Sequence, residues 1–398
     1  MEQATQTQVK PATPAENTPI DSTELHRNAL DRDTKGGKQP KSFFKRLFKG
    51  RERVSADAGE KNNWKAWLYL APSLILLAVF TFYPLINTIV IAFLKDYNYV
   101  TQTNSGFTLD NFGTVLGLVG QTSSQTTVYL WQCTKQVTDG VTHYYFSTSS
   151  GVLTEVYFQT DVIKYALPNT LLITFITVPI SIIISLLISI GLNSIKAFKK
   201  VLQTIFFVPY VTNAIAVGMV FAVLFDSKGI INFVFGLSGN NSFWIDQGAG
   251  LGNKPAWMPM FALCVYIVWH SLPFKILIFL SGLQNIDKQY YDAAKIDCAG
   301  KWKTMMNVTV PLLSPQILYI MITSFIASFK EYTSVVGLFG MPSTDGGGTK
   351  NMYTIVYYIY EQIKGNVGYG GAAAVLLFII IMIFTAIQFQ VSKKRVYY

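Results

Sequence analysis

Polar side chains inside long apolar stretches are the residues of this sequence most able to do chemistry. Ser324, Ser328 and Glu331 are spaced at i, i+4 and i+7, which places them on one face of a predicted helix. An ionisable group within a membrane helix faces a cavity or a charged partner. Small side chains also let two helices pack closely. The spacing therefore predicts either a polar binding surface or a helix contact.

Two further apolar stretches carry polar residues midway along their length. One holds His270, Ser271 and Lys275, and the other holds Tyr210 and Asn213. Aromatic faces and hydroxyl partners suit sugar rings, but tyrosine also gathers at membrane interfaces. His270 could instead bond a backbone carbonyl, and Lys275 could pair with an acidic group of this chain or of a partner. Both interpretations stay open for these five residues.

The sequence contains none of the common catalytic motifs. No GxxxxGK[ST], GxSxG or HExxH pattern occurs, and the Gly-rich run at 346–350 has the wrong residue order for a phosphate-binding loop. The three cysteines and three histidines are scattered, which predicts no disulfide framework and no metal site. We expect a chain that is not an enzyme and has no cofactor. If its activity is driven by ATP, another polypeptide hydrolyses the ATP.

The composition is that of a membrane protein. Hydrophobic residues make up 51% of the chain and charged residues only 14%, whereas a soluble domain carries about a quarter charged residues. The net charge of +10 comes from lysines and arginines gathered in particular loops. Such clusters indicate membrane topology rather than nucleic-acid binding.

The apolar stretches predict an all-α protein with six transmembrane helices. Each is long enough to cross about 30 Å of hydrocarbon. They cover residues 67–94, 162–192, 201–225, 259–283, 312–339 and 370–391.

The distribution of basic residues predicts the orientation. Lysines and arginines lie in the tail, near 196–200, at 288–303 and at 393–395, and these segments fall on one side of a six-span chain. Basic loops stay in the cytoplasm. Both termini and the loop 284–311 are therefore expected to be cytoplasmic.

The remaining segments complete a division into four parts. Residues 1–62 are too polar to fold and read as a disordered basic tail, although 41–49 could form an amphipathic helix on the membrane surface. No signal peptide is evident. Residues 63–94 form the first transmembrane helix, 95–160 an extracytoplasmic loop, and 161–398 a five-helix core. The alternation at 141–159, around a Ser-Ser-Gly turn, predicts a small β-rich insert at 117–160 that either contacts a soluble partner or acts as a spacer.

A charged, helix-prone island lies between the fourth and fifth apolar stretches. Residues 290–315 combine a small Ala-Ala face with flanking charges, and two prolines close the segment. A small face between charges can be held closely by another protein. The residues are Asp292, Ala293, Ala294, Lys295, Asp297, Lys301, Lys303, Pro311 and Pro315.

This island resembles the "EAA" loop in the membrane subunits of bacterial ATP-binding-cassette importers. The match rests on Asp292-Ala293-Ala294, the step to position 298 and the Val-x-Val-Pro ending at Pro311. In that family the loop is a short cytoplasmic helix-turn-helix held in a cleft of the ATPase subunit. The resemblance implies ATPase coupling by Asp292, Ala293, Ala294, Asp297, Cys298, Ala299, Gly300 and Pro311.

The island departs from the family pattern at two positions. Asp292 stands where glutamate is usual, and Cys298 stands where the family has glycine. That glycine serves the turn between the two helices. Either Gly300 relieves the turn, or position 298 is strained in a left-handed conformation, or the turn has another shape.

Residues 67–395, apart from the insert, resemble the permeases of the carbohydrate uptake class. The stretches FKKVLQTIFFVPYVTNAIAVGMVFAVLF and SGLQNIDKQYYDAAKID carry the resemblance, which is strongest to the larger permease of the maltose transporter. In that relative the sugar is held mid-membrane by the helices that flank the EAA loop. The substrate-facing positions fall on His270, Ser271, Phe274, Ser324, Ala327 and Ser328, with Tyr210 and Asn213 as further candidates.

The resemblance implies a permease subunit of a bacterial inner membrane, which pairs with a second permease and two copies of an ATP-binding subunit. An extracytoplasmic solute-binding protein would deliver a sugar, most simply an oligosaccharide. The same machinery could import glycerol phosphate or another polar solute. A self-contained secondary transporter or channel would need no ATPase, and a membrane enzyme would need a motif that the chain lacks.

Overall fold

The computed structural model describes residues 63–122, 126–138, 141–147, 152–195, 199–226, 228–236, 245, 257–340 and 352–392. The predicted basic tail 1–62, the lysine at 196 and the basic C-terminal residues 393–395 lie outside these residues. The chain divides into two units, Met1–Pro72 and Ser73–Tyr398. The described part of the first unit is the beginning of helix α3. The other elements belong to the second unit.

Four helical segments of the described chain are long and apolar enough to cross a membrane: Trp67–Ala92, Val162–Ser194, Trp257–Gln284 and Val367–Ser392. They agree with four of the six predicted stretches. Their helices are α3 (Asn63–Leu77), which continues through a π-helical turn (Ala78–Phe82) into α4 (Tyr83–Ala92), then α6 (Leu167–Ser194) after another π-helical turn (Val162–Ala166), α10 (Trp257–Gln284) and α17 (Val367–Ser392).

The predicted single helix at 201–225 is wrong, because the structure breaks it. Helix α7 (Lys199–Val211) and helix α8 (Ala214–Leu224) are bent by 98°. Asn213 lies at the break, and its Oδ1 atom accepts hydrogen bonds from the backbone N–H groups of Ile215 (2.9 Å) and Ala216 (3.4 Å). This side chain satisfies donors that a new helix start leaves free, which favours the bend.

The predicted helix at 312–339 also ends early. Helix α14 (Ser314–Phe329) stops before Lys330, and a separate helix α15 (Thr333–Phe339) follows. The Oε1 atom of Glu331 accepts a hydrogen bond of 3.0 Å from the N–H of Ser334, in the first turn of α15. Before α14, the helical run Lys301–Leu312 is bent by 69° from it. The described helices thus give four spans, or up to six if each bent pair is one span.

Two glycines bring α8 and α15 into close contact. A Cβ atom added at Gly218 would lie 2.7 Å from the Cα atom of Gly337. Only hydrogen fits between backbones at that separation. The short helix α15 therefore packs on α8 through two residues without side chains.

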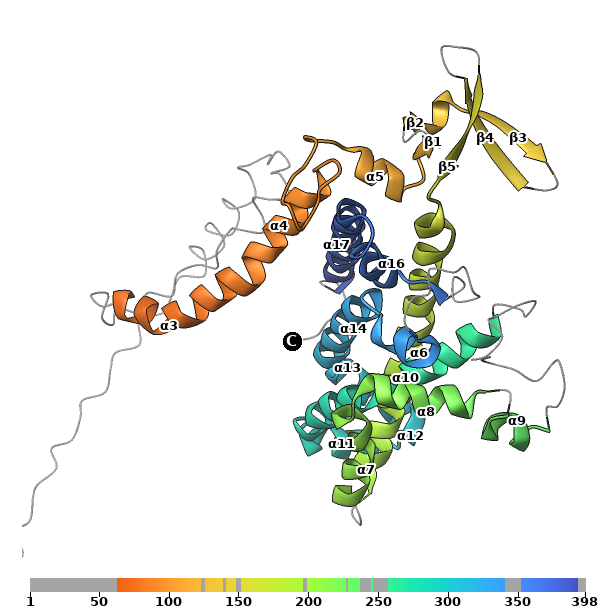
Figure 1. Cartoon of the computed structure of the whole chain (residues 1–398). Helices are drawn as coiled ribbons and strands as arrows, with labels where there is room; N and C mark the ends of the chain where they lie inside the picture. The colour runs from red at the N-terminus through yellow and green to blue at the C-terminus, as the bar shows by residue number, and fades with distance from the viewer. Residues whose placement is uncertain are drawn as a thin grey trace, which may run out of the picture. The chain divides into compact units, whose positions relative to one another are not determined.

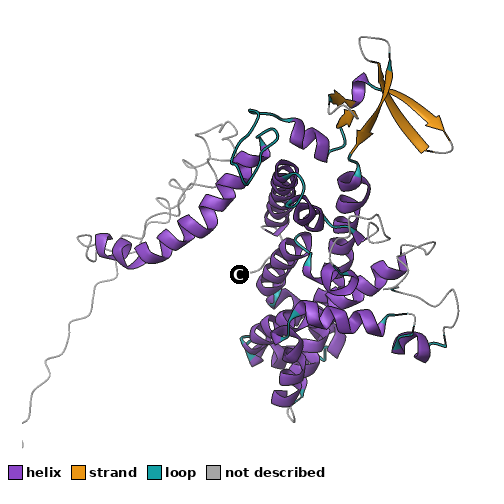
Figure 2. Ribbon diagram, in the orientation of Figure 1, coloured by secondary structure: helices purple, strands orange, loops and turns teal. Residues whose placement is uncertain are grey.

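The segment between the first two long helices contains a five-stranded antiparallel sheet in the order β2-β1-β5-β4-β3 (Figures 1 and 2). Strands β4 and β5 pair as predicted, with Tyr144 opposite Val156 and Phe146 opposite Thr154. The other strands were not foreseen, because they are short and do not alternate. The strands are β1 (Val119–Thr122), β2 (Thr127–Tyr129), β3 (Thr134–Thr138), β4 (Val141–Ser147) and β5 (Leu153–Phe158).

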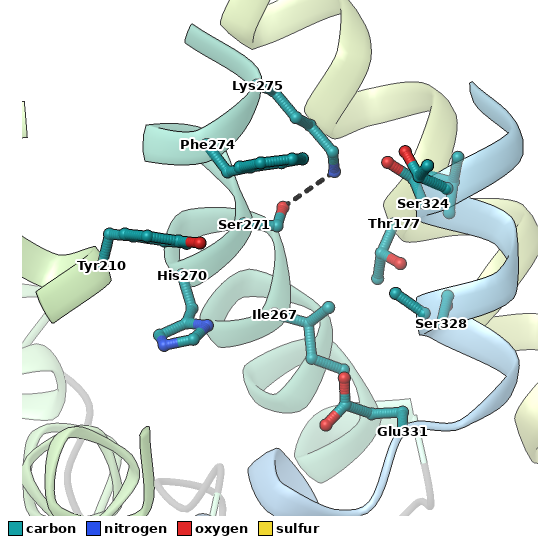
Figure 3. Close-up of a pocket in the computed structure, with 13 residues that line it drawn as sticks. Thr177, Tyr210, Ile267, His270, Ser271, Phe274, Lys275, Ser324, Ser328 and Glu331 are labelled. Atoms are coloured by element: carbon teal, nitrogen blue, oxygen red, sulfur yellow. Dashed lines mark hydrogen bonds between the residues drawn. The ribbon is translucent and has the colours of Figure 1, made fainter. Parts of the chain in front are cut away.

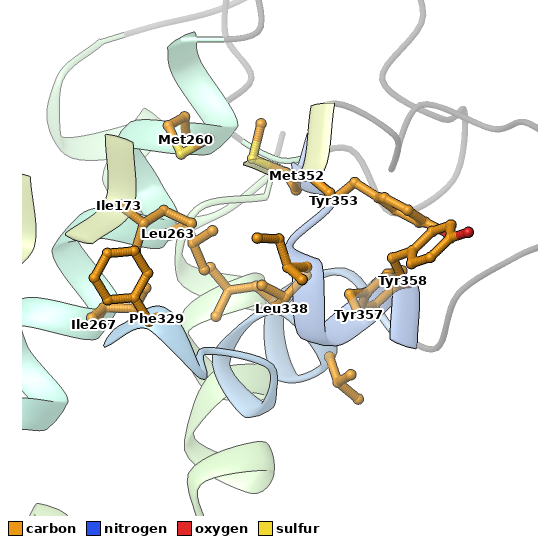
Figure 4. Close-up of a cluster of buried hydrophobic side chains, with 14 of the residues drawn as sticks. Ile173, Met260, Leu263, Ile267, Phe329, Leu338, Met352, Tyr353, Tyr357 and Tyr358 are labelled. Carbon is orange, nitrogen blue, oxygen red and sulfur yellow. The ribbon is translucent and has the colours of Figure 1, made fainter. Parts of the chain in front are cut away.

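The main core lies where α6, α10, α15, α16 and α17 meet. Figure 4 shows its centre, in which Phe329, Leu338 and the aromatic side chains of Tyr357 and Tyr358 are buried. Helix α4 packs on α17, and α6 packs on α10 along their length. The shorter helices are α5 (Asp110–Val115), α9 (Ile230–Val234), α11 (Lys288–Ile296), α12 (Lys301–Thr304), α13 (Val310–Leu312) and α16 (Ile355–Gln362), with a π-helical turn at Met305–Thr309.

Candidate functional site

A cavity of about 270 Å³ opens between α6, α10 and α14, with Tyr210 of α7 on one side (Figure 3). It lies where the helices on either side of the charged island approach α6. The lining residues are Thr177, Val178, Tyr210, Ile267, His270, Ser271, Phe274, Lys275, Thr323, Ser324, Ala327, Ser328 and Glu331.

The structure brings together all but one of the residues predicted to face a substrate. His270, Ser271, Phe274, Ser324, Ala327, Ser328 and Tyr210 all line the cavity. Asn213 is not among the lining residues, and its side chain caps α8 instead.

The polar residues of α6 were not predicted from the sequence, although their spacing indicates a common helix face. Thr170, Thr174, Thr177, Ser181, Ser185 and Ser189 are buried and spaced by three or four, so they form a hydroxyl stripe on one helix face. Several of these hydroxyls donate to a carbonyl of their own helix, such as Ser189 to Ser185 at 2.7 Å. These small side chains let α10 approach closely, and Thr177 lines the cavity.

One wall of the cavity is aromatic. The rings of Tyr210 and Phe274 stack with centroids 6.0 Å apart and planes within 16°. His270 lies beside them and packs against Tyr266 at 5.8 Å. Flat apolar surface and hydrogen-bonding groups thus meet at one place, which is the usual character of a small-molecule site.

The opposite wall offers hydroxyl groups. Ser324 and Ser328 of α14 point into the cavity in Figure 3. The Oγ atom of Ser328 is buried and has no hydrogen-bond partner among the described residues. A buried hydroxyl without a partner costs free energy, so native proteins nearly always provide one. This hydroxyl is therefore available to a bound molecule.

Lys275 is the cation of this cavity. Its side chain is buried, and its Nζ atom donates to Ser181 Oγ of α6 at 2.5 Å and to Ser271 Oγ at 3.0 Å. Glu331 lies at the far end of the cavity from Lys275 (Figure 3). The cavity is thus lined by one charge of each sign at separate ends.

The charged island folds as a helix-turn-helix. Asp287 caps α11 by accepting a 3.0 Å hydrogen bond from Gln289 N–H. At the other end, Cys298 N–H donates to Lys295 O and Ala299 N–H donates to Ala294 O, which is the Schellman pattern of a helix C-terminus. That pattern requires a left-handed residue, and Cys298 has a φ of 51°.

The structure decides between the alternatives for this turn. Gly300 has a φ of −63° and caps α12, so it does not supply the left-handed conformation. Cys298 supplies it, at a position that favours glycine.

The outer face of the island is exposed. Asp292 and Lys295 pair at 2.7 Å, and the hydrogen bond from Lys295 lowers the pKa of the Asp292 carboxyl. Ala294 is buried, whereas Ile296 and Trp302 are 81% and 67% exposed. These two large apolar residues were not predicted as part of the island's surface. Among the other predicted coupling residues, Ala293, Asp297, Cys298 and Gly300 are exposed and Ala299 and Pro311 are half-buried.

Comparison with known proteins identifies the family. The model of the "binding-protein-dependent transport system inner membrane component" matches residues 181–397, more than half of the chain. The match includes the cavity helices α10 and α14 and the helix-turn-helix.

Relatives support this match. The lactose transport system permease protein LacF of Rhizobium radiobacter is 24% identical over 336 residues, which are 83% of this chain and 94% of LacF. The arabinooligosaccharides transport system permease protein AraP of Bacillus subtilis is 32% identical over 57% of this chain and 71% of AraP. These relatives confirm the predicted resemblance to importer permeases of the carbohydrate class.

A solved structure shares the fold. It is a chain from the crystal structure of a bacterial ABC transporter involved in the import of the acidic polysaccharide alginate, with a TM-score of 0.61 and 16% identity. The match covers 83% of this chain and 96% of the other. The chain thus belongs to the membrane-embedded family of inner membrane components of binding-protein-dependent transport systems.

Proposed function

We propose that this chain is the permease subunit of an ATP-driven importer of a sugar, most simply an oligosaccharide. The observation that carries the proposal is the cavity between α6, α10 and α14, which combines an aromatic wall with the unpaired hydroxyl group of Ser328. Apolar sugar faces stack on aromatic rings, and sugar hydroxyls need hydrogen-bond partners. The relatives LacF and AraP are named as permeases of lactose and arabinooligosaccharide transport systems, which supports this cargo class.

The helix-turn-helix at 288–312 is proposed to couple the cavity to ATP hydrolysis. The predicted residues Asp292 to Gly300 lie at the end of α11 and in the turn after it, and all but Ala294 and Ala299 are exposed. Ile296 and Trp302 add apolar surface for a partner. The run Lys301–Leu312 leads into α14, which lines the cavity. Closure of two ATPase subunits around such loops would tilt the attached helices and alternate access to the cavity.

The complete machine is proposed to hold this chain, a second permease, two ATP-binding subunits and an extracytoplasmic solute-binding protein. Six spans, with each bent pair crossing once, would place both termini in the cytoplasm of a bacterium. The parts would then be the tail 1–62, the first span 63–94, the outer loop 95–160 and the core 161–398 with its coupling loop 284–311. The sheet at 119–158 would lie outside, where it can contact the binding protein.

Sugar-stimulated ATP hydrolysis by the assembled complex in nanodiscs tests the proposal. Purification through a tagged permease should recover the second permease and the ATPase. Ser328→Phe, which fills the cavity, should abolish stimulation by the sugar-loaded binding protein while the complex still assembles. Ile183→Phe is the matched control, because Ile183 is 58% exposed on the side of α6 away from the cavity lining. Ala293→Glu should prevent recovery of the ATPase.

Other outcomes would favour the alternatives. A permease that transports alone, without ATPase and indifferent to Ala293→Glu, would be a secondary transporter or channel. Uptake of glycerol 3-phosphate but of no sugar would keep the machinery and change the cargo. That cargo is named for a further relative, the UgpA permease of Yersinia pestis.

A further inference from the structure

Lys275 stands within an apolar helix and has an unusual set of partners. Its side chain is only 5% exposed, yet it lines the cavity. Its Nζ atom contacts two serine hydroxyls, one on α6 and one on its own helix (the dashed line of Figure 3 marks the second). An ammonium group carries three protons, so one donor is left for the cavity.

The two hydroxyls act as acceptors toward Lys275. Ser181 Oγ donates its proton to the carbonyl of Val178 at 2.9 Å, and Ser271 Oγ donates to the carbonyl of Val268 at 2.9 Å. Each hydroxyl donates its single proton to a carbonyl of its own helix, so it can only accept a hydrogen bond from the lysine. When Lys275 is charged, these two acceptors take two of the three protons of its ammonium group.

No acidic group of the described chain pairs with this charge. The ion pairs of the described residues are His143 with Glu155 and Lys295 with Asp292. Glu331, the acidic residue of the cavity, lies near Ile267, and Lys275 is two turns further along α10, about 12 Å at the rise of an α-helix. Glu331 is also engaged with the backbone of α15. Burying an ammonium group without a counter-charge costs free energy, and a bound anion would lower that cost.

We propose that Lys275 forms an anion subsite in the cavity and that the transported saccharide carries an acidic group. This inference rests on the proposed function and narrows it to an acidic oligosaccharide. The saccharide's anion would take the third N–H of the ammonium, while its rings lie against Tyr210 and Phe274. Ser328, on the facing helix, would bond a sugar hydroxyl.

A matched pair of ligands tests this subsite. The probe is trigalacturonate, and its control is the trimethyl ester, which has the same rings without the charges. Binding to the purified complex in nanodiscs is measured by calorimetry. The complex should bind trigalacturonate, and Lys275→Met should weaken binding about 30-fold or more, as loss of one partner of a buried charge pair does. Lys275→Arg, which keeps the charge, should restore part of the affinity, and rising salt should weaken binding only in the wild type and in Lys275→Arg.

The controls separate a subsite from a structural tie between α6 and α10. Lys330→Met removes an exposed lysine just outside the cavity and should not change the affinity for trigalacturonate or for its methyl ester. If Lys275→Met weakens both ligands equally, or if the methyl ester binds the wild type as tightly as the acid, the proposal is overturned while a sugar importer stands. The comparison of the acid with its methyl ester uses the wild-type protein alone. If no saccharide binds but glycerol 3-phosphate does so through Lys275, the anion subsite stands and the sugar proposal falls.

Discussion

Replacing Cys298 by glycine should stabilise the turn of the helix-turn-helix. Cys298 is exposed and has a φ of 51°, and its N–H closes one of the two Schellman hydrogen bonds, to Lys295 O at 3.0 Å. The side chain's strongest polar contact is a 3.9 Å approach of Sγ to Ile296 O, so little is lost when it is removed. The change therefore acts mainly on backbone conformation.

The size of the effect follows from two opposing contributions. A residue with a Cβ atom pays about 1–2 kcal/mol in the left-handed region. Glycine also makes the unfolded chain more flexible, which lowers the stability of the folded turn by about 0.4–1 kcal/mol. The difference leaves about 0.5–1 kcal/mol of stabilisation, which is about two- to five-fold in the opening equilibrium of the turn.

Hydrogen exchange measures this opening directly. The amides of Cys298 and Ala299 close the turn, so in the variant they should exchange about two- to five-fold more slowly. Ala299→Gly is the matched control, because Ala299 does not have a positive φ. It should leave exchange unchanged or speed it. If Cys298→Gly failed to slow exchange, or if both variants slowed it equally, the strain at position 298 would be refuted.

Two further predictions concern the packing of α8 on α15 and the β4–β5 pair of the sheet. Gly218→Ala forces a methyl group to within 2.7 Å of Gly337, and this overpacking should lower stability in thermal unfolding by about 1–3 kcal/mol. Gly191→Ala is the control, because the new methyl group meets open space. It should raise stability by about 0.5–1 kcal/mol through helix propensity. Hydrogen bonds from His143 and from a neighbouring tyrosine lower the pKa of Glu155. The ionised carboxylate therefore stabilises the β4–β5 pair at pH values above the usual glutamate pKa of about 4.3. This stabilisation is lost as the pH falls through the lowered pKa of Glu155. Amide protection factors in β4 and β5 should decline there in the wild type but not in Glu155→Gln. Equal pH profiles would contradict the role of that pair.

The long helices could be predicted because length and hydropathy alone define them. The runs at 162–192 and 259–283 contain enough apolar residues to span a bilayer, and α6 and α10 form there. The helix-turn-helix was expected from the resemblance to the EAA loop, which rests on Asp292-Ala293-Ala294 and Pro311. Its Schellman turn follows from backbone hydrogen bonds that any sequence can make, provided one residue accepts a positive φ.

The breaks in α7–α8 and α14–α15 could not be read from hydropathy. An apolar average does not distinguish one straight helix from two helices joined at an angle. What permits each break is a single polar side chain, Asn213 or Glu331, that takes over the backbone N–H groups freed at the new helix start. The cavity was foreseen only in part for a similar reason, since the hydroxyls of α6 look like packing residues until α10 is placed against them.

Polar residues within apolar helices therefore either support the backbone or stay available for a ligand. The sequence alone does not distinguish these roles, but the hydrogen bonds of each residue do. Asn213 has its side-chain oxygen bonded to two backbone donors, so its presence in the membrane is explained by the bend. Ser328 has a buried hydroxyl without a partner among the described residues, and Lys275 has a charge held only by neutral acceptors. Both line the same cavity, and the lack of a partner for each group, more than the polarity of either residue, supports the proposal that cargo binds there.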